Sequence, residues 1–204
     1  MTEIWPGQGD DEPDTPHGET QLEAVPAAPA PPPAPRAEHA AGELEIPEDV
    51  DVLEGEAGPT RKQIAVVVSK FNGEVTTQLL ASALAELDGF GVDRRRITVV
   101  PVPGAFELPL AAMALAKTRR YACIVALGCV IRGETPHFDY VAGEAASGLQ
   151  LSALETGVPV AFGVLTLESP EQATARIAKG ADAARTALEM VDLFAQLRQA
   201  AAQG

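Results

Sequence analysis

The sequence predicts an α/β fold: a three-layer α/β/α sandwich around a four-stranded parallel sheet, preceded by a disordered N-terminal tail. Two observations predict it. Between residues 61 and 200, four apolar runs rich in β-branched residues alternate with four helical patterns, which is typical of a parallel sheet covered by helices on both faces. The first 60 residues are different in kind, because they hold 11 of the 17 prolines.

The N-terminal part also carries the charge of the whole chain. Residues 1–60 hold 15 of the 29 acidic side chains and one basic side chain, Arg36, whereas residues 61–204 hold 14 of each sign. The formal net charge of −14 therefore belongs to the tail. Residues 1–46 have few apolar side chains to offset the entropy of ordering. We expect a disordered acidic, Pro/Ala-rich tail over 1–46, serving as a spacer or partner-binding arm or having no role, and one domain over 47–204.

The elements of this domain follow from their patterns. Strands are predicted at Gln63–Val68, Ile97–Val102, Tyr121–Ile131 and Val158–Thr166, since continuous apolar runs suit strands buried on both faces. Four helices are predicted between and after them, with these residues on their apolar faces: Val75, Leu79, Ala83, Leu84 and Leu87; the run Phe106–Lys117; Val141, Ala145, Gly148, Leu149 and Ser152; and Ala184, Leu188, Val191 and Ala195.

Composition and motifs argue against several classes of protein. The domain has no basic excess and the tail would repel phosphates, so we expect no nucleic-acid partner. No apolar run approaches the length of a membrane span and the N-terminus does not resemble a signal peptide. Cys123 and Cys129 share one apolar run, which suggests two core residues in a reducing cytoplasm. We find no metal-ligand spacing, no glycine-rich nucleotide loop and no nucleophile elbow.

Polar and aromatic residues follow each strand. Because ligands of such sheets bind beyond the carboxyl ends of the strands, we expect the residues of the four junctions to converge on one edge of the sheet. Phe71 and Phe106 can sandwich a planar ring, or pack in the core. Asn72 and Glu107 offer donor and acceptor groups to a heterocycle, although solvated loop residues would look the same. Arg176, on the last helical region, can contact a phosphate or remain a surface arginine.

The third junction is the most informative. Thr135 and Pro136 form a good helix start, Gly133 permits close approach of a ligand, and Arg132 lies nearby. This is either a phosphate pocket at a helix N-terminus or an ordinary helix cap. His137, the only histidine after residue 60, is either a proton shuttle or a packing residue.

Taken together, the junctions resemble the lumazine synthase (6,7-dimethyl-8-ribityllumazine synthase) family over roughly residues 50–197. The matching segments are Val52–Gly55, Ile64–Asn72, Val102–Pro109, Gly128–Val141, Val158–Thr166, Glu171–Ala173 and Ala187–Met190. The resemblance implies a flavodoxin-like sheet and a transferase of riboflavin biosynthesis. It would condense 5-amino-6-(D-ribitylamino)uracil with 3,4-dihydroxy-2-butanone 4-phosphate, without metal or organic cofactor. A catalytically inactive flavin- or lumazine-binding scaffold of the same fold is the alternative.

The resemblance also assigns site residues. His137 would transfer protons, and Glu134, Thr135 and Arg176 would hold the butanone phosphate. The ribitylaminouracil would be bound by Phe71, Ala105, Phe106, Glu107, Cys129, Val130, Ile131 and Phe162. In the family Phe162 and Arg176 come from a neighbouring subunit, so the resemblance implies a homopentamer, or an icosahedral cage of about 60 copies built from pentamers.

Two features bear on that assembly. Val50–Glu56 matches the family's N-terminal strand, which pairs with an adjacent subunit's sheet. Only Ile177 and Ala178 separate Arg176 from Lys179, where the family usually has a longer link near the contacts that build cages, so the choice between pentamer and cage stays open, as does a site role for Lys179.

Overall fold

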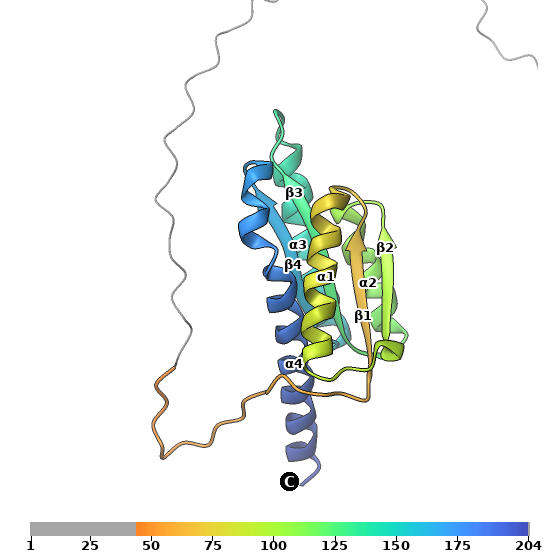
Figure 1. The fold of residues 1–204 in the computed structure, drawn as a ribbon. Helices are drawn as coiled ribbons and strands as arrows, with labels where there is room; N and C mark the ends of the chain where they lie inside the picture. Colours follow the sequence, from red (N-terminus) through yellow and green to blue (C-terminus); the bar gives the residue numbers. More distant parts are fainter. Residues whose placement is uncertain (1–43, 204) are drawn as a thin grey trace, which may run out of the picture. The chain divides into compact units, whose positions relative to one another are not determined.

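A four-stranded parallel sheet forms the centre of the molecule in a computed structural model that describes residues 44–203. The strands β1 (Gln63–Ser69), β2 (Ile97–Val102), β3 (Tyr121–Ile131) and β4 (Val160–Leu167) lie in the order β2-β1-β3-β4 (Figure 1). The predicted α/β fold is therefore confirmed, with the last strand beginning two residues later than expected. The predicted tail, 1–46, lies almost entirely outside the described residues.

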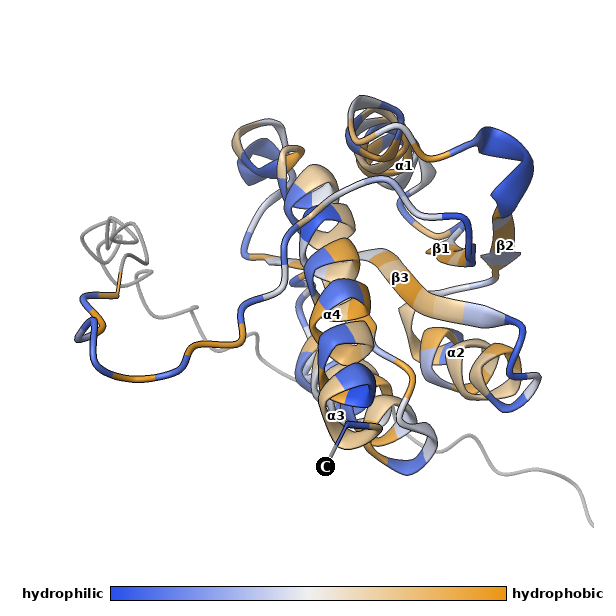
Figure 2. Ribbon diagram, turned by 90° about the horizontal axis from the view of Figure 1, so that it is seen from below, coloured by the Kyte–Doolittle hydropathy of each residue, from blue (hydrophilic) through white to orange (hydrophobic). Residues whose placement is uncertain are grey.

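Helices cover both faces of this sheet. Side chains of α1 (Gly73–Gly89) and α4 (Lys179–Ala201) pack in one core cluster, and those of α2 (Leu108–Lys117) and α3 (His137–Thr156) pack in another. Alternate residues of β1 enter the two clusters: Ile64 and Val66 face α1 and α4, whereas Ala65 and Val67 face α2 and α3. Figure 2 shows the apolar strands β1 and β3 between α1 and α2. Burial on both faces explains why these strands read as unbroken apolar runs.

The segment that precedes β1 lies along α4. The Glu56 backbone N–H donates to Asp192 Oδ2 at 3.1 Å, and Gln196 Nε2 donates to the Glu54 carbonyl at 2.7 Å. A strand expected over Val50–Glu56 is not formed in this single chain. The resemblance places the pairing partner of that strand in another subunit, so the strand stays a prediction about an assembly of several copies.

The start of α4 packs tightly against α1. The short helical turn η4 (Thr174–Arg176) is followed almost directly by α4 at Lys179, as the short link in the sequence requires. A Cβ on Gly180 would lie 2.3 Å from the Leu79 carbonyl oxygen, so only glycine permits the backbones to approach this closely. Within residues 44–203, every helix is too short or too polar to cross a membrane.

Candidate active site

A cleft of about 690 Å³ opens at the carboxyl ends of the strands. Residues of the first three strand-to-helix junctions line it, together with the start of α3. The lining consists of Phe71, Asn72, Pro103, Gly104, Ala105, Phe106, Glu107, Cys129, Val130, Ile131, Gly133, Thr135, His137, Phe138, Tyr140 and Val141. The fourth junction does not contribute to this lining, although it lies beside the third, where the Arg132 N–H donates to the Leu167 carbonyl.

The first junction is tied to both neighbouring strands. The backbone N–H groups of Lys70 and Phe71 donate to the carbonyls of Val102 and Pro103, at 2.8 and 3.0 Å. Asn72 adopts the left-handed conformation (φ 56°) and donates from Nδ2 to the Cys129 carbonyl at 2.9 Å. The chain can then enter α1 while the Phe71 ring stays 71% exposed at the rim of the cleft.

The second junction is a short helical turn, η2 (Ala105–Glu107). Glu107 Oε2 accepts a hydrogen bond from the Gly104 N–H at 2.9 Å, which fixes the loop and the carboxylate together. Phe106 remains 57% exposed, whereas Ala105 is buried. Phe71 and Phe106 thus line the cleft with exposed rings, which excludes the alternative that they are core residues.

The third strand extends beyond the end of its neighbour. β1 pairs with β3 only as far as Leu127, whereas β4 pairs with β3 up to Ile131. The Arg132 N–H points toward β4, where it donates to the Leu167 carbonyl. Because backbone groups alternate sides along a strand, the N–H and carbonyl of Ile131 point to the β1 side. The end of β3 therefore presents an open backbone edge to the cleft.

The Cys129 thiol lies under this edge and is only 2% exposed. Burial raises the pKa of the thiol to about 11. At neutral pH the sulfur is consequently a neutral, small apolar group, and what Cys129 offers to the rest of the site is its carbonyl, which holds Asn72.

The start of α3 differs in detail from the expectation. The helix begins at His137, Pro136 occupies the N-cap position, and no side chain caps the helix, so the predicted cap by Thr135 is wrong. Proline lacks an N–H and its φ of −63° already suits the helix, which explains why the helix starts without a hydroxyl cap. Thr135 and His137 both line the cleft.

Arg132 does not offer a free charge to an anion. Its guanidinium donates to Glu168 at 2.7 Å and to Asp139 at 3.1 and 3.2 Å, and it stacks on the Phe138 ring at 4.1 Å. The hydrogen bonds that it donates to Asp139 and then to Glu168 raise the pKa of Arg132. We therefore interpret Arg132 as a residue that holds the third and fourth junctions together, not as a phosphate ligand.

Three predicted site residues lie outside the cleft lining. Glu134 is exposed beside it, Arg176 is exposed on η4, and Phe162 is 49% exposed on the edge strand β4. No lysine or arginine lines the cleft within residues 44–203. The single chain therefore gathers nine of the twelve predicted site residues and lacks a cation for a phosphate.

Sequence reasoning missed other lining residues. Tyr140 and Val141 enter the cleft from the first turns of α3, and the short spacing from His137 is a signal that could have found them. Asn72 is expected to be either a ligand-facing amide or a solvated loop residue, but its Nδ2 donates to a carbonyl within the protein. Asparagine just before a helix is a known signature of a left-handed turn.

Comparison with known proteins identifies the relatives of this chain. The model of the 6,7-dimethyl-8-ribityllumazine synthase family matches residues 61–195. Proteins named 6,7-dimethyl-8-ribityllumazine synthase from Yersinia pestis (strain Pestoides F) and Yersinia pseudotuberculosis serotype O:1b (strain IP 31758) are each 48% identical over 155 residues, which cover 73% of this chain and 99% of the relative. The chain belongs to the 6,7-dimethyl-8-ribityllumazine synthase family.

Proposed function

We propose that this chain condenses 5-amino-6-(D-ribitylamino)uracil with 3,4-dihydroxy-2-butanone 4-phosphate to give 6,7-dimethyl-8-ribityllumazine, phosphate and water. The observation that carries the proposal is one cleft that joins exposed aromatic rings, an open strand edge, Thr135 and His137, in a chain of this family. The reaction is an amine attack on a ketone, imine formation, loss of phosphate and ring closure.

The pyrimidine fits the first half of the cleft. Phe71 and Phe106 offer exposed ring faces for stacking. The outward N–H and carbonyl of Ile131 can pair with the donor and acceptor edge of a uracil, in the way that another strand would. The carboxylate of Glu107 is already held by Gly104 through Oε2, so Oε1 is positioned to accept from a substrate N–H or hydroxyl.

Proton transfer is assigned to His137. The imidazole is exposed at the first residue of α3 and lines the same cleft as the backbone edge of β3. An imidazole is the side chain best suited to give and take protons near neutral pH. Cys129 is not the nucleophile, because its thiol is protonated at that pH. Catalysis then rests on positioning two substrates and on proton transfer.

The phosphate requires a charge that the single chain does not place in the cleft. Arg176 and Phe162 are exposed and do not line the cleft of their own chain, which supports the proposal that they reach the cleft of a neighbouring copy. We propose a homopentamer whose sites lie between subunits; an icosahedral cage built from such pentamers is the larger alternative. Both cysteines are free thiols, which fits a cytoplasmic location.

Turnover with both substrates tests the proposal. Product formation is followed by the absorbance and fluorescence of a lumazine, with a working family member as the positive control. His137→Ala should lower kcat by about 10²–10⁴-fold while the dissociation constant of a substrate analogue stays near that of the wild type. Tight ligand binding without turnover in the wild-type protein would instead establish the inactive scaffold.

A further inference from the structure

A small hollow opens at the amino ends of the strands, at the edge of the sheet opposite the cleft. Its volume is about 190 Å³, and three cationic residues from separate segments line it: Lys62, Arg119 and Arg198. Lys62 directly precedes β1, Arg119 lies between α2 and β3, and Arg198 is in the last turn of α4. We call this hollow the basic depression and define it by these three residues with Tyr121 and Phe194, which also line it.

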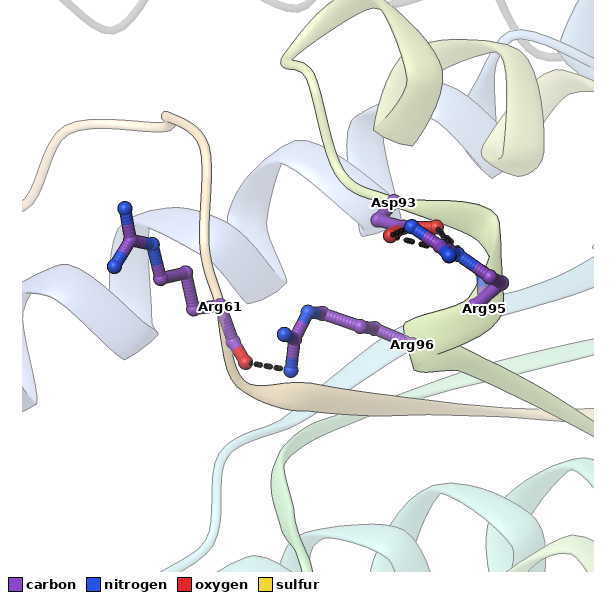
Figure 3. A network of polar contacts seen from close by, with 4 residues as sticks. All are labelled: Arg61, Asp93, Arg95 and Arg96. Carbon is purple, nitrogen blue, oxygen red and sulfur yellow. Dashed lines mark hydrogen bonds and ion pairs between the residues drawn. The ribbon is translucent and has the colours of Figure 1, made fainter.

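Carboxylates do not neutralise these three cations. In the part of the chain that the structure describes, none of the three forms an ion pair, whereas Arg95, in front of β2, is paired with Asp93 (Figure 3). Next to this pair Arg96 donates to the backbone carbonyl of Arg61, whose side chain points away (Figure 3). The bond ties the residue before Lys62 to the start of β2, so the backbone that carries Lys62 is held in place.

One carboxylate acts on the depression from nearby. Hydrogen bonds from the Gln196 side chain and then from the Glu56 backbone lower the pKa of Asp192, and Lys62 adds to the lowering. Asp192 Oδ2 is already held by two donors, at 2.7 Å from Gln196 Nε2 and 3.1 Å from the Glu56 nitrogen. Among the described residues no acidic side chain lines the depression itself. A local positive charge therefore remains, although residues 61–204 are neutral overall.

Helix ends explain part of this arrangement. α2 and α3 end where β3 and β4 begin, and the C-termini of helices attract cations. Arg119 Nη1 donates to the Thr156 carbonyl at the end of α3 at 2.5 Å, and Arg198 lies in the last turn of α4. Lys62 precedes a strand, so a helix dipole does not account for it. Nor does a dipole require cations from three segments to surround one hollow.

The backbone around the depression is irregular in two places. Arg119 has a φ of 59°, a left-handed conformation that glycine usually adopts after a helix and that strains a residue with a side chain. The register of β1 with β3 shifts between Gln63 and Ile64, which leaves Ala122 as an extra residue of β3. Ala122 and Tyr121 consequently both line the depression, whereas neighbours in a regular strand point to opposite faces. Both irregularities bring groups to the same hollow.

The size of the depression favours a compact anion. Pockets for drug-sized ligands and cofactors have volumes of roughly 300–1,000 Å³, well above the volume of about 190 Å³ found here. A group of a few heavy atoms fits, since one water molecule takes up about 30 Å³ in the liquid. Guanidinium groups bind phosphoryl oxygens in pairs, and a lysine adds a point charge. A phosphoryl group matches these requirements in size, charge and number of acceptors.

We propose that the basic depression binds a compact phosphoryl anion, such as inorganic phosphate or pyrophosphate, at a site separate from the cleft. Lys62 and Arg198 bind its oxygens from two sides. The Arg119 guanidinium carries five N–H donors, of which the Thr156 carbonyl takes one, and the others are directed to the anion. The bound anion joins the start of β1, the link before β3 and the end of α4. Because the three cations are exposed, the affinity is modest and falls with added salt.

Two double variants of the full-length chain locate the site. Lys62→Gln with Arg198→Gln removes two cations of the basic depression and keeps Arg119 at the end of α3. Arg61→Gln with Lys117→Gln is the matched control, because it makes the same change in net charge at exposed residues that do not line the depression. Isothermal titration calorimetry with sodium pyrophosphate at low salt measures the affinity of both variants and of the wild type.

The depression variant should bind pyrophosphate about tenfold more weakly than the wild type, since two charged contacts are lost. The control should stay within about twofold, because its charges act only through screened solvent. An equal loss in both variants would mean attraction by net charge alone and would overturn the proposal. Unchanged affinity in the depression variant would overturn it as well, because the anion would then lie elsewhere, as in the cleft.

Thermal unfolding checks folding and binding together. Without ligand, both variants should unfold within about 2 °C of the wild type, because the replaced side chains are exposed. A ligand that binds only the folded state raises the unfolding temperature. Pyrophosphate should therefore raise it in the wild type and the control, and much less in the depression variant. The same rise in all three proteins would contradict binding at this site.

Further titrations identify the source of the phosphoryl group. Glycerol phosphate that binds the wild type as inorganic phosphate does would show that the phosphate end of a small ester is accepted. Binding of phosphate and pyrophosphate alone would restrict the site to the free anions. A single-stranded oligothymidylate tests a nucleic acid instead. Oligothymidylate that binds more tightly than pyrophosphate, is not displaced by it and is lost in the depression variant would make a nucleic acid the occupant and overturn the proposal.

Discussion

Asn72 donates a hydrogen bond from Nδ2 to the backbone carbonyl of Cys129 at 2.9 Å, from a backbone held at a φ of 56°. One residue therefore performs two tasks. Its left-handed backbone turns the chain from β1 into α1, and its side chain joins that turn to the end of β3. The bond holds Phe71 and the open edge at Ile131, which line the same cleft, in a fixed relation.

Replacing Asn72 separates these tasks. Asn72→Gly keeps the left-handed backbone accessible and loses the hydrogen bond, so unfolding should become easier by about 1–2 kcal/mol. Asn72→Ala loses the bond and strains the backbone, and should be about 1 kcal/mol less stable again. Both should lower kcat/KM. Urea unfolding at one protein concentration and steady-state kinetics measure the effects, and equal stability of the two variants would contradict the role of the backbone.

Gly180 tests the close approach of α4 to α1. A Cβ there would lie 2.3 Å from the Leu79 carbonyl oxygen, and backbone must move to admit it. We expect Gly180→Ala to destabilise the fold by about 1–3 kcal/mol. Gly143→Ala is the matched control, because it places the same methyl group in a helix with nothing within 4 Å and should stabilise by up to about 1 kcal/mol. Thermal unfolding of both variants measures these two changes in stability, which should be opposite in sign.

The burial of Cys129 predicts how stability varies with pH. Its pKa is raised to about 11 from a usual value of 9.0, so the folded chain keeps a proton that the unfolded chain releases between these values. This thiol therefore leaves the free energy of unfolding unchanged below pH 9. Between pH 9 and about 11 the free energy of unfolding falls by about 1.4 kcal/mol per pH unit. The Cys129→Ala variant has no thiol at this position, so its free energy of unfolding does not fall for this reason. Urea unfolding across this range should therefore show the wild type falling faster than the variant, and parallel curves would contradict the prediction.

Much of the fold was predictable because two kinds of pattern agree. Unbroken apolar runs such as Ile64–Val68 require burial on both faces, and the alternation with helices then requires a parallel sheet. The segment over Val50–Glu56 could not be predicted in the same way. Its apolar residues include Val52 and Leu53, which are exposed in the single chain, and the pairing expected for them depends on the neighbouring copy that we propose.

The candidate site was predictable to the level of junctions, and its details were not. Topology brings the ends of β1, β2 and β3 together, whatever side chains follow them. The ion pairs of charged side chains are harder to predict, because the partner of a side chain can be distant in sequence. Arg132 meets Glu168 across 36 residues, and nothing local in the sequence shows that its charge is already satisfied. Thr135 is likewise a residue type that often caps helices. In the structure Pro136 occupies the N-cap position and no side chain caps the helix.

A site shared between copies predicts a specific result when two defective variants are mixed. His137→Ala removes the proposed proton shuttle from the cleft, and Arg176→Ala removes the cation that we assign to the neighbouring copy's phosphate. Each variant alone should be nearly inactive. After joint refolding in equal amounts, about a quarter of the sites should combine an intact His137 with an intact Arg176 from the next subunit. Activity should rise to about that fraction of the wild type.

The control for this mixture is the double variant refolded with the wild type. If each site spans two copies, random mixing leaves about a quarter of the sites intact, whereas sites contained in one chain would leave about half. Differently tagged copies and mass measurement of the assembly show that mixing has taken place. Half activity in the control, together with no recovery from the two single variants in mixed assemblies, would place Arg176 outside the site of the neighbour and leave the phosphate without its proposed cation.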